Sequence, residues 1–462
     1  MNDLLPPSLR RILQETPNLA GAHLVGGCVR DWLLGIAPKD FDVEVYGLPW
    51  DRLVRTLSRW GRVDQVGKSF GVIKLTVGPG ETYDFSLPRR DSKVAPGHRG
   101  FAVEFAPDLP PAEASARRDF TLNALMWHPG RGELLDFHGG AQDLRNRILR
   151  HTSAAFDEDP LRVLRGMQFA GRFGLTGAPE TLSLCRRISN RHGELALERI
   201  RGEWFKWAGE STLPSAGMLW LRDSGWRIHY PELCALEGVA QDPEWHPEGD
   251  VWTHTLVCLD ELVRLPRWQQ ARAEDRIRLA FATLCHDLGK PACTRTEERN
   301  GRPRIVSPGH DVAGVPLSEA LLGRLGASED LVATVGRLVA AHLAHLQENT
   351  PRSVRRLANR LAPATLSELE ILITADAFGR PPNPKVEPPG LKRLRALAEE
   401  LQLQAQAPRP ILLGRHLIDR GLRPGPEFSR ILSAAFEAQL DGEFEDLSGA
   451  LRWLDRRVTD TA

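Results

Sequence analysis

The spacing of apolar residues changes near position 146, and this change constrains the fold of the 462-residue chain more than any other feature. Before it, short apolar runs such as AHLVGG and GVIKLTVG alternate with helix-like stretches such as LPWDRLVRTLSRWG, which is typical of a small mixed α/β domain. After it, segments such as EDPLRVLRGMQFAGRFG place apolar residues three and four positions apart, which predicts an almost entirely helical remainder. We therefore expect an α+β protein in which packed helices follow a small mixed α/β domain.

Length and charge narrow the classes of function. Domains usually hold about 100 to 200 residues, so this chain predicts three or four of them. Lys and Arg total 60, as do Asp and Glu, and this balance excludes a general polycation that coats nucleic acid. Any RNA contact must be local. Residues 145–207 are the best candidate, because 12 Lys and Arg stand there against 7 Asp and Glu, although a solvated helix face explains such arginines equally well.

Cysteine usage and the start of the chain bear on its location. The six cysteines are scattered, without a CxxC pair or a disulfide framework, which indicates a reduced, cytoplasmic setting. The opening MNDLLPPSLRRILQETPN carries acidic residues and prolines where a secretory segment needs an apolar core, and no uninterrupted apolar run of about 18 residues occurs. We expect no membrane segment, and the sequence leaves the oligomeric state open.

A glycine pair in LVGGCVRDWLLG, residues 24–35, forms part of the first candidate site. Gly26 and Gly27 end an apolar strand and open a helix, and without Cβ atoms they let backbone N–H groups approach a phosphate. Arg30 on that helix can balance the charge of a triphosphate. A Gly-Gly pair alone is often only a turn, so the pair indicates a phosphate site only in combination with other residues.

Carboxylates come directly after it, in PKDFDVEVYG. Residues alternate along a strand, so Asp40 and Asp42 share one face while Phe41 and Val43 point to the core. Two such carboxylates can hold two divalent cations, which activate an attacking hydroxyl and neutralise the pyrophosphate that leaves. Asp84, on a later strand-like run, can complete the set. Asp-x-Asp is a common surface spacing, and only its combination with the glycine pair predicts a catalytic site.

Four motifs now occur in order: GGCVRDWLLG, DFDVEVYG, RRDFTLNAL (residues 117–125) and EDPLRVLRGMQFAGRFG (residues 158–174). In this respect the chain resembles the class II tRNA nucleotidyltransferases and the bacterial poly(A) polymerases, over roughly residues 20–210. The resemblance implies a head with the nucleotidyltransferase fold of the DNA polymerase beta superfamily, in which Asp40 and Asp42 bind Mg²⁺. It also implies that CTP and ATP are the substrates and that the 3′ end of tRNA is the acceptor.

The resemblance assigns the EDxxR element, with Asp159 and Arg162, to selection of the incoming base. A carboxylate accepts from an exocyclic amino group and a guanidinium donates to a ring nitrogen or carbonyl, so this pair suits cytosine and adenine and excludes uracil and guanine. The resemblance also places Arg118, Asn123 and Arg165 in the nucleotide pocket. The alternative is an ordinary helix N-terminal carboxylate followed by a surface arginine.

Two further segments extend the resemblance. Residues 88–114 are rich in Gly, Pro and charge and too irregular for a strand or helix throughout. They resemble the family's flexible loop, which is shortened in members that add only CC, so its presence favours complete CCA addition. LERIRGEWFKWAG, residues 197–209, resembles the family's ERxxxE element, in which Glu198, Arg199 and Glu203 can equally be a helix-stabilising charge set.

The helical part carries a second constellation. HDLGK follows an apolar helical run, with one histidine upstream and an aspartate far downstream, and in this it resembles the metal-dependent HD phosphohydrolases. The resemblance implies that His254, His286, Asp287 and Asp376 ligate one ion, and that His310 and His342 serve a second ion or a phosphate, with Lys290 available for phosphate charge. Imidazole and carboxylate ligands suit Mn²⁺, Ni²⁺, Fe²⁺ or Mg²⁺, and such an ion generates hydroxide for attack on a phosphoester. His-Asp also occurs at residues 310–311, so the dipeptide alone proves nothing.

Together these patterns predict a nucleotidyltransferase head (residues 1–145), a helical neck that selects the nucleotide (146–215), an HD phosphohydrolase domain (216–385) and a helical tail (386–462). The stretch FGRPPNPKVEPPG, residues 378–390, cannot continue a helix and marks the last boundary. The preferred function is CCA addition to tRNA with a second hydrolase activity. The alternatives are an enzyme that adds only CC or only A, a poly(A) polymerase, and an HD phosphohydrolase whose head senses nucleotide.

Overall fold

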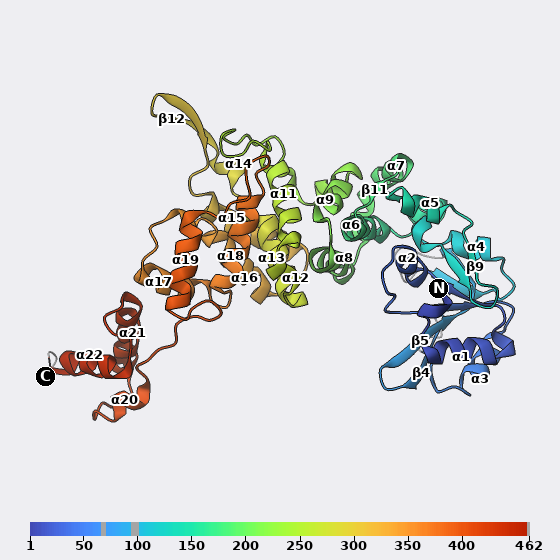
Figure 1. Cartoon of the computed structure of the whole chain (residues 1–462), viewed down its shortest axis with the longest axis horizontal. Helices are drawn as coiled ribbons and strands as arrows, with labels where there is room; N and C mark the ends of the chain where they lie inside the picture. Colours follow the sequence, from blue (N-terminus) through green and yellow to red (C-terminus); the bar gives the residue numbers. More distant parts are fainter. Residues whose placement is uncertain (66–70, 94–100, 460–462) are drawn as a thin grey trace. The chain divides into compact units, whose positions relative to one another are not determined.

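The computed structural model describes residues 1–65, 71–93 and 101–459, and the chain forms two compact units (Figure 1). One unit contains Met1–Trp207 and Ala216–His229, and the other contains Ala208–Ser215 and Tyr230–Ala462. The expected head and most of residues 146–215 therefore share a unit. Most of the expected HD domain, from residue 230 onward, and the tail lie in the other unit, whereas residues 216–229 lie in the first. The division into four parts remains a prediction.

A mixed sheet organises the first unit, as the sequence predicts. In the described ranges its strand order is β3-β4-β5-β2-β1-β8-β9, and every neighbouring pair is antiparallel except β2 and β5. All four residues of β1 are buried, as suits a central strand. The strands are β1 (Ala22–Val25), β2 (Asp42–Val45), β3 (Arg62–Asp64), β4 (Val72–Gly78), β5 (Glu81–Ser86), β8 (Met126–His128) and β9 (Glu133–Leu135).

Helices surround this sheet and continue beyond it. The glycine pair behaves as predicted, because β1 ends at Val25 and α2 begins at Gly27. The helices are α1 (Pro7–Glu15), α2 (Gly27–Leu33), α3 (Trp50–Leu57), α4 (Pro111–Ala116), α5 (Gly140–Arg145), α6 (Leu161–Phe173), α7 (Pro179–Arg187), α8 (Leu197–Glu210) and α9 (Pro214–Asp223). Both α8 and α9 contain residues of each unit.

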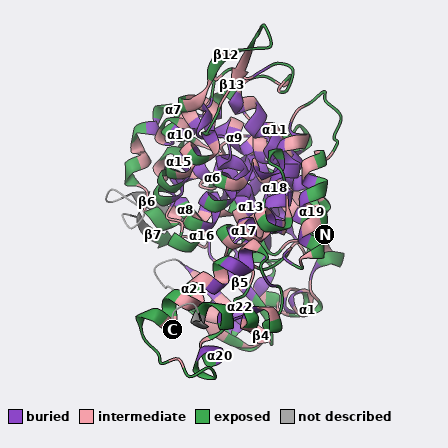
Figure 2. Ribbon diagram, turned by 90° about the vertical axis from the view of Figure 1, so that its left-hand side faces the viewer, coloured by how far each residue is buried: buried purple, intermediate pink, exposed green. Residues whose placement is uncertain are grey.

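The second unit is built from helices that surround a buried core, and Figure 2 shows buried residues gathered on α11, α13 and α18. Two of these helices have well-defined starts. The Asp250 side chain accepts from the Thr253 N–H at 2.9 Å, and Thr365 and Glu368 form a capping box. The helices are α10 (Pro231–Cys234), α11 (Val251–Arg264), α12 (Pro266–Gln269), α13 (Ala273–Cys285), α14 (Lys290–Cys293), α15 (His310–Arg324), α16 (Glu329–Ala341), α17 (Pro351–Leu361), α18 (Leu366–Phe378), α19 (Pro389–Glu400), α20 (Gly414–Ile418), α21 (Pro426–Asp441) and α22 (Leu447–Thr459).

The ends and lengths of the helices can be compared with the sequence predictions, and short 3₁₀ helices complete the fold. The break predicted at residues 378–390 is confirmed, because α18 ends at Phe378 and α19 begins at Pro389. Among the described residues, no helix combines the length and apolar character that a membrane crossing requires. The 3₁₀ helices are η1 (Asn2–Leu4), η2 (Pro17–Leu19), η3 (Thr121–Asn123), η4 (Ala154–Glu158), η5 (Ser189–Glu194), η6 (Trp226–His229) and η7 (Ala344–Leu346).

Strand pairs also form where the sequence predicts loops or helices. β6 (Arg89–Lys93) pairs with β7 (Phe101–Phe105) inside the segment 88–114, whose residues 94–100 lie outside the described ranges. In the helical part, β12 (Arg295–Arg299) and β13 (Arg302–Val306) form a hairpin, and β10 (Ile148–Leu149) pairs with β11 (Thr176–Gly177). Pairing is decided between segments, so the pattern along either segment alone does not predict it.

Candidate active sites

The carboxylates of the head meet at the edge of β2. Asp42 begins β2 and is directly opposite Asp84 of β5 in parallel register, so the two side chains are neighbours on one face. Phe41 and Val43 are buried, as the alternation predicts. The pKa of Asp42 is raised, first because protein atoms displace water around it and then by the carboxylates of Asp84 and Asp40, while Arg118 opposes the shift. Such crowding of negative charge is what a divalent cation would relieve.

Gly26 makes room for an arginine. Gly26 has φ +73°, and a Cβ built on it would lie 2.9 Å from Nη1 of Arg118. The Gly26 N–H donates to the Leu125 carbonyl, so the predicted contact with a phosphate falls to Gly27. Nε of Arg118 is buried without a hydrogen-bond partner among the residues that the structure describes. A cation close to a glycine turn and a carboxylate pair is suited to a phosphate.

Arg30 and Asn123 line the same pocket, and both are held in its wall by hydrogen bonds to other side chains. Arg30 is 5% exposed, donates to Asp31 and to Asn123 Oδ1 at 2.8 Å, and lies 4.5 Å above the Phe173 ring. The amide nitrogen of Asn123 donates to Asp119 at 2.9 Å. In this arrangement both side chains therefore bind protein groups in the wall of the pocket.

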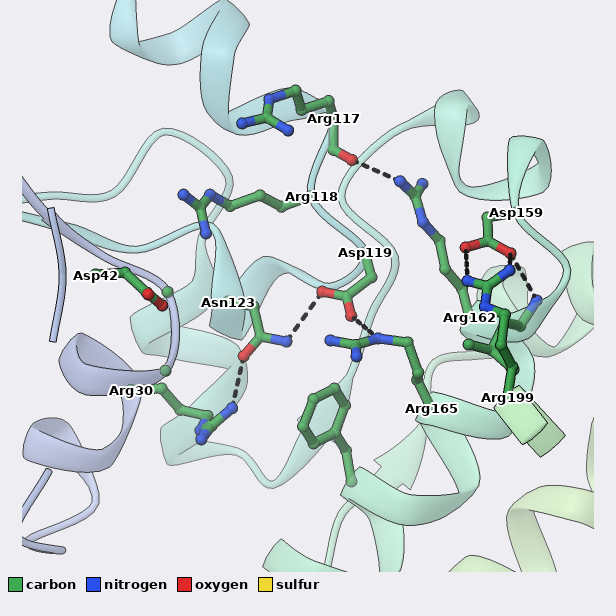
Figure 3. Close-up of a pocket in the computed structure, with 14 residues that line it drawn as sticks. Arg30, Asp42, Arg117, Arg118, Asp119, Asn123, Asp159, Arg162, Arg165 and Arg199 are labelled. Carbon is green, nitrogen blue, oxygen red and sulfur yellow. Dashed lines mark hydrogen bonds and ion pairs between the residues drawn. The ribbon is translucent and has the colours of Figure 1, made fainter. Parts of the chain in front are cut away.

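Asp119 connects this chain of hydrogen bonds to α6, a role that sequence analysis missed. Arg165 donates to Asp119 at 2.7 Å. Burial opposes ionisation, but Arg165 and the Asn123 amide hold the pKa of Asp119 below its usual value. The network thus runs from Arg165 through Asp119 and Asn123 to Arg30 (Figure 3). The only hint in the sequence was the position of Asp119 inside the RRDF motif.

Asp159 and Arg162 both line the pocket, and their side chains bind other groups. Arg199 of α8 clamps the Asp159 carboxylate, with Nη2–Oδ2 at 2.7 Å and Nη1–Oδ1 at 3.3 Å. Arg162 donates to the backbone carbonyls of Ala155 and Arg117, at 2.6 and 2.8 Å. Asp159 also accepts from the Leu161 N–H at the start of α6, so the alternative role of a helix-terminal carboxylate coexists with its place in the pocket.

These side chains enclose a cavity of about 420 Å³ within the first unit (Figure 3). Arginines and carboxylates dominate its wall, and one aromatic ring, Phe169, offers a flat apolar surface. The cavity is lined by Gly26, Gly27, Arg30, Asp42, Arg117, Arg118, Asp119, Asn123, Asp159, Leu161, Arg162, Arg165, Phe169 and Arg199. Asp40 and Asp84 are not among these residues.

The second constellation converges in the second unit. Six elements or their ends supply it: α11, the end of α13, the start of α14, the start of α15, the end of α16, and α18. Nε2 of His254 lies 3.1 Å from Asp376, and Asp287 lies 3.3 Å from His286 and 3.2 Å from His310. Nε2 of His342 lies 3.2 Å from Nε2 of His310. The structure thus brings together all of the residues predicted for this site, which are all buried: His254, His286, Asp287, Lys290, His310, His342 and Asp376.

Backbone carbonyls orient three of the imidazoles. Nδ1 of His286, His310 and His342 each contacts the carbonyl three residues earlier, at 2.7, 2.6 and 2.7 Å. Nδ1 of His254 instead faces Glu248 at 2.7 Å. A ring whose Nδ1 carries the proton presents an unprotonated Nε2, as a metal ligand requires.

Asp287 lies at the centre of the group. Burial opposes ionisation, yet His286 and Lys290 hold the pKa of Asp287 well below its usual value. Nζ of Lys290 is 2.7 Å from Asp287 and also donates to Gln241, so Lys290 compensates this carboxylate and is not free for a phosphate. Nε2 of His286 is buried without a hydrogen-bond partner in the described part of the chain. That orphaned nitrogen beside carboxylates and other imidazoles fits a divalent metal.

Sequence analysis missed three residues of this site. Cys258, one turn after His254, belongs to a group of potential ligands with His254, His286 and Asp376. Glu248 accepts from both His246 and His254. The spacing of four residues between His254 and Cys258 is the only hint of this kind that the sequence offered, because His246 and Glu248 precede α11.

Gly289 of the HDLGK motif is required by space. Its φ of −79° is open to any residue, but a Cβ would lie 2.1 Å from the His310 carbonyl oxygen and 2.7 Å from the Gly314 N. We expect Gly289→Ala to lower the free energy of unfolding by about 1–3 kcal/mol or more through overpacking, as measured by denaturant titration of the metal-free protein. Gly323→Ala is the control. Gly323 lies in α15, the helix that also contains His310 and Gly314, and a Cβ there would meet no atom within 4 Å, so this variant should not be destabilised. Equal midpoints for both variants would contradict this account.

Comparisons with known proteins identify both domains. Residues 22–150 match the poly A polymerase head domain family and residues 252–380 match the HD domain family. The fold and the sites define a nucleotidyltransferase that carries an HD domain, and both domain types generally use divalent metals.

The multifunctional CCA protein of Actinobacillus pleuropneumoniae is 36% identical over 372 residues, which cover 78% of this chain and 85% of that one. The multifunctional CCA protein of Tolumonas auensis is 36% identical over 378 residues, covering 78% and 84%. The chain belongs to the family of multifunctional CCA proteins.

Solved structures share the fold at low identity. The Bacillus stearothermophilus CCA-adding enzyme in complex with CTP is 22% identical, with a TM-score of 0.65 and 99% of each chain covered. The Thermotoga maritima CCA-adding enzyme complexed with tRNA is 17% identical, with a TM-score of 0.59 and coverage of 99% of this chain and 97% of that one.

Proposed function

We propose that this protein transfers CMP and AMP from CTP and ATP to the 3′ end of tRNA without a nucleic-acid template. The observation that carries the proposal is the pair Asp42 and Asp84 in register, of which Asp42 lines the same pocket as Asp159 and Arg162. The family membership and the complexes of similar structures with CTP, ATP and tRNA support it.

Asp40 and Asp42, with Asp84, are the proposed ligands of Mg²⁺ in the head. Bound there, the metal would lower the pKa of the attacking 3′ hydroxyl and neutralise charge on the leaving pyrophosphate. Arg118, whose guanidinium approaches the Gly26 turn, is the proposed cation for the triphosphate. Arg30 and Asn123 contribute by fixing the pocket wall instead of binding the nucleotide.

Asp159 and Arg162 are the proposed base-selecting pair. Arg199 holds Asp159 in the arrangement described above, so the amino group of cytosine or adenine must share that carboxylate with Arg199 or displace it. Arg162 would likewise release one of the two backbone carbonyls to which it donates before it could donate to the base. Arg165 supports the pocket through Asp119.

The HD domain is the proposed site of a second activity, hydrolysis of phosphoesters. His254, His286, Asp287 and Asp376 are the proposed ligands of one divalent ion, with Mn²⁺, Ni²⁺, Fe²⁺ or Mg²⁺ as candidates. His310 and His342 would serve a second ion or a phosphate. We also propose the head, neck, HD domain and tail boundaries given by the sequence, and a cytoplasmic location.

The decisive experiment uses tRNA transcripts that lack one, two or all three residues of the terminal CCA. Each transcript is incubated with one labelled nucleoside triphosphate at a time. Three successive additions in the order C, C, A support the proposal. Arrest after CC, or addition of A alone, would make this a partial enzyme, and a long A tail would make it a poly(A) polymerase.

Base selection gives a separate prediction. In Asp159→Asn the new amide can donate to the carbonyl of uracil, so we expect the preference for CTP over UTP to fall about 10- to 100-fold, since one such pair of hydrogen bonds discriminates by about 1–3 kcal/mol. The measurement is kcat/KM for each triphosphate. Asp157→Asn makes the same change at an exposed position outside the pocket and should leave the ratio unaltered. An unchanged ratio in Asp159→Asn would refute base reading by Asp159.

A further inference from the structure

Cys258 introduces sulfur into a site where the sequence predicts only imidazole and carboxylate ligands. It lies one turn of α11 after His254, so both side chains project from the same face of that helix. Residues four apart on one helix are well placed to bind one ion together, as in helical zinc motifs.

The geometry places the thiol among the ligand atoms. Sγ of Cys258 lies 3.3 Å from Nε2 of His254, the nitrogen that also faces Asp376 at 3.1 Å. One potential ligand atom from each of Cys258, His254, His286 and Asp376 lies within 4.8 Å of the other three. Cys258 is fully buried. Gly379 packs directly against it, because a Cβ on Gly379 would lie 2.3 Å from Sγ of Cys258. The thiol therefore has little freedom to turn elsewhere.

A second observation points to a ligand at the same place. His286 is 1% exposed, and its Nε2 lies 3.3 Å from Oδ2 of Asp287 but makes no hydrogen bond in the part of the chain that the structure describes. Its Nδ1 is held by the Thr283 carbonyl at 2.7 Å, so the orphaned Nε2 points into the group that contains Cys258. Leaving a buried polar atom unpaired costs about 1–3 kcal/mol unless something else binds it.

We propose that Cys258 is a ligand of the metal ion in the HD domain and makes this site select Zn²⁺, Co²⁺ or Fe²⁺ over Mg²⁺. The inference rests on the metal centre under the proposed function. Binding forms a metal–sulfur bond and releases the thiol proton to solvent. Thiolate favours these ions, whereas Mg²⁺ requires oxygen ligands. The ion that supports hydrolysis is thus set by a side chain outside the HD motif.

Titration of the metal-free full-length protein with Co²⁺ tests the proposal without an activity assay. We expect a near-ultraviolet thiolate-to-cobalt charge-transfer band that Cys258→Ser abolishes. We also expect Cys258→Ser to weaken Co²⁺ binding by about 100-fold or more, because losing a ligand should cost at least as much as losing a residue that orients one. Mg²⁺ binding should change little. Cys28→Ser is the matched control, since Cys28 is also buried and lies close to Asp42, and the band should persist in it.

The other outcomes separate the two proposals. Co²⁺ binding by the wild type without the band, and with equal affinity in Cys258→Ser, overturns the role of Cys258 and leaves the metal centre standing. Binding that His286→Ala does not weaken overturns the metal centre itself. If Cys258→Ser fails to fold, X-ray absorption of the wild type with one equivalent of Zn²⁺ decides: a sulfur shell at about 2.3 Å supports the proposal, and a shell of only nitrogen and oxygen refutes it.

Discussion

Asp42→Asn is expected to reduce nucleotide addition to tRNA by about 10³-fold or more, because a metal that organises charge in the transition state is worth several kcal/mol, at about 1.4 kcal/mol per factor of ten. The amide keeps the shape of the side chain but removes the charge that the ion needs. Asp42 is exposed at the start of β2, so the fold should survive. The measurement is single-turnover CMP and AMP incorporation at saturating Mg²⁺ and triphosphate, with thermal unfolding recorded in parallel.

Glu133→Gln is the control for this result. Glu133 is an exposed carboxylate on β9, at an outer strand of the same sheet and outside the pocket, and we expect full activity. Phosphoester hydrolysis should also persist in Asp42→Asn, because the HD residues lie in the other unit. Near-normal nucleotide addition by Asp42→Asn would remove Asp42 from catalysis and with it the proposed polymerising mechanism.

Asp287→Asn is expected to abolish phosphoester hydrolysis, also by about 10³-fold or more, because the ion loses a charged ligand at the centre of the site. Lys290 and His310 lose their carboxylate partner at the same time. Hydrolysis of a model phosphodiester should be measured with each candidate metal in turn. Nucleotide addition by the same sample reports whether the protein is folded and should be unchanged.

The chain supplies its own control for this experiment, because His-Asp occurs twice. Asp311→Asn alters the second dipeptide, on α15, where the aspartate does not belong to the groups of potential metal ligands. We expect this variant to keep both activities. Loss of both activities in an Asp287→Asn protein whose thermal unfolding matches that of the wild type would show that the two sites depend on each other. Unchanged hydrolysis would exclude Asp287 as a ligand.

Local periodicity explains what the sequence predicted well. Alternation along DFDVEV predicted that Phe41 and Val43 would point to the core, and both side chains are buried. The glycine pair predicted the junction of β1 and α2, and spacing of three and four residues predicted the helices of the second unit. These features arise from neighbours in the chain, because the direction of a side chain depends on the local backbone.

Partnerships between distant segments were decided by tertiary structure alone. Arg199 binds Asp159 across 40 residues, a contact that the sequence did not predict. Arg30 and Asn123 appeared in the motifs as free ligands, yet buried hydrogen bonds hold them in the wall of the pocket. A buried polar group must find a partner, and the identity of that partner depends on which helices and strands meet.

The sequence by itself determined the two kinds of chemistry, their order along the chain and the residue types that each requires. Tertiary structure decided that Asp84 stands beside Asp42, because β5 pairs in parallel with β2, and that Cys258 joins the histidines of the HD domain. Side-chain direction is fixed within a few residues, whereas the choice of neighbour emerges only when remote segments pack together.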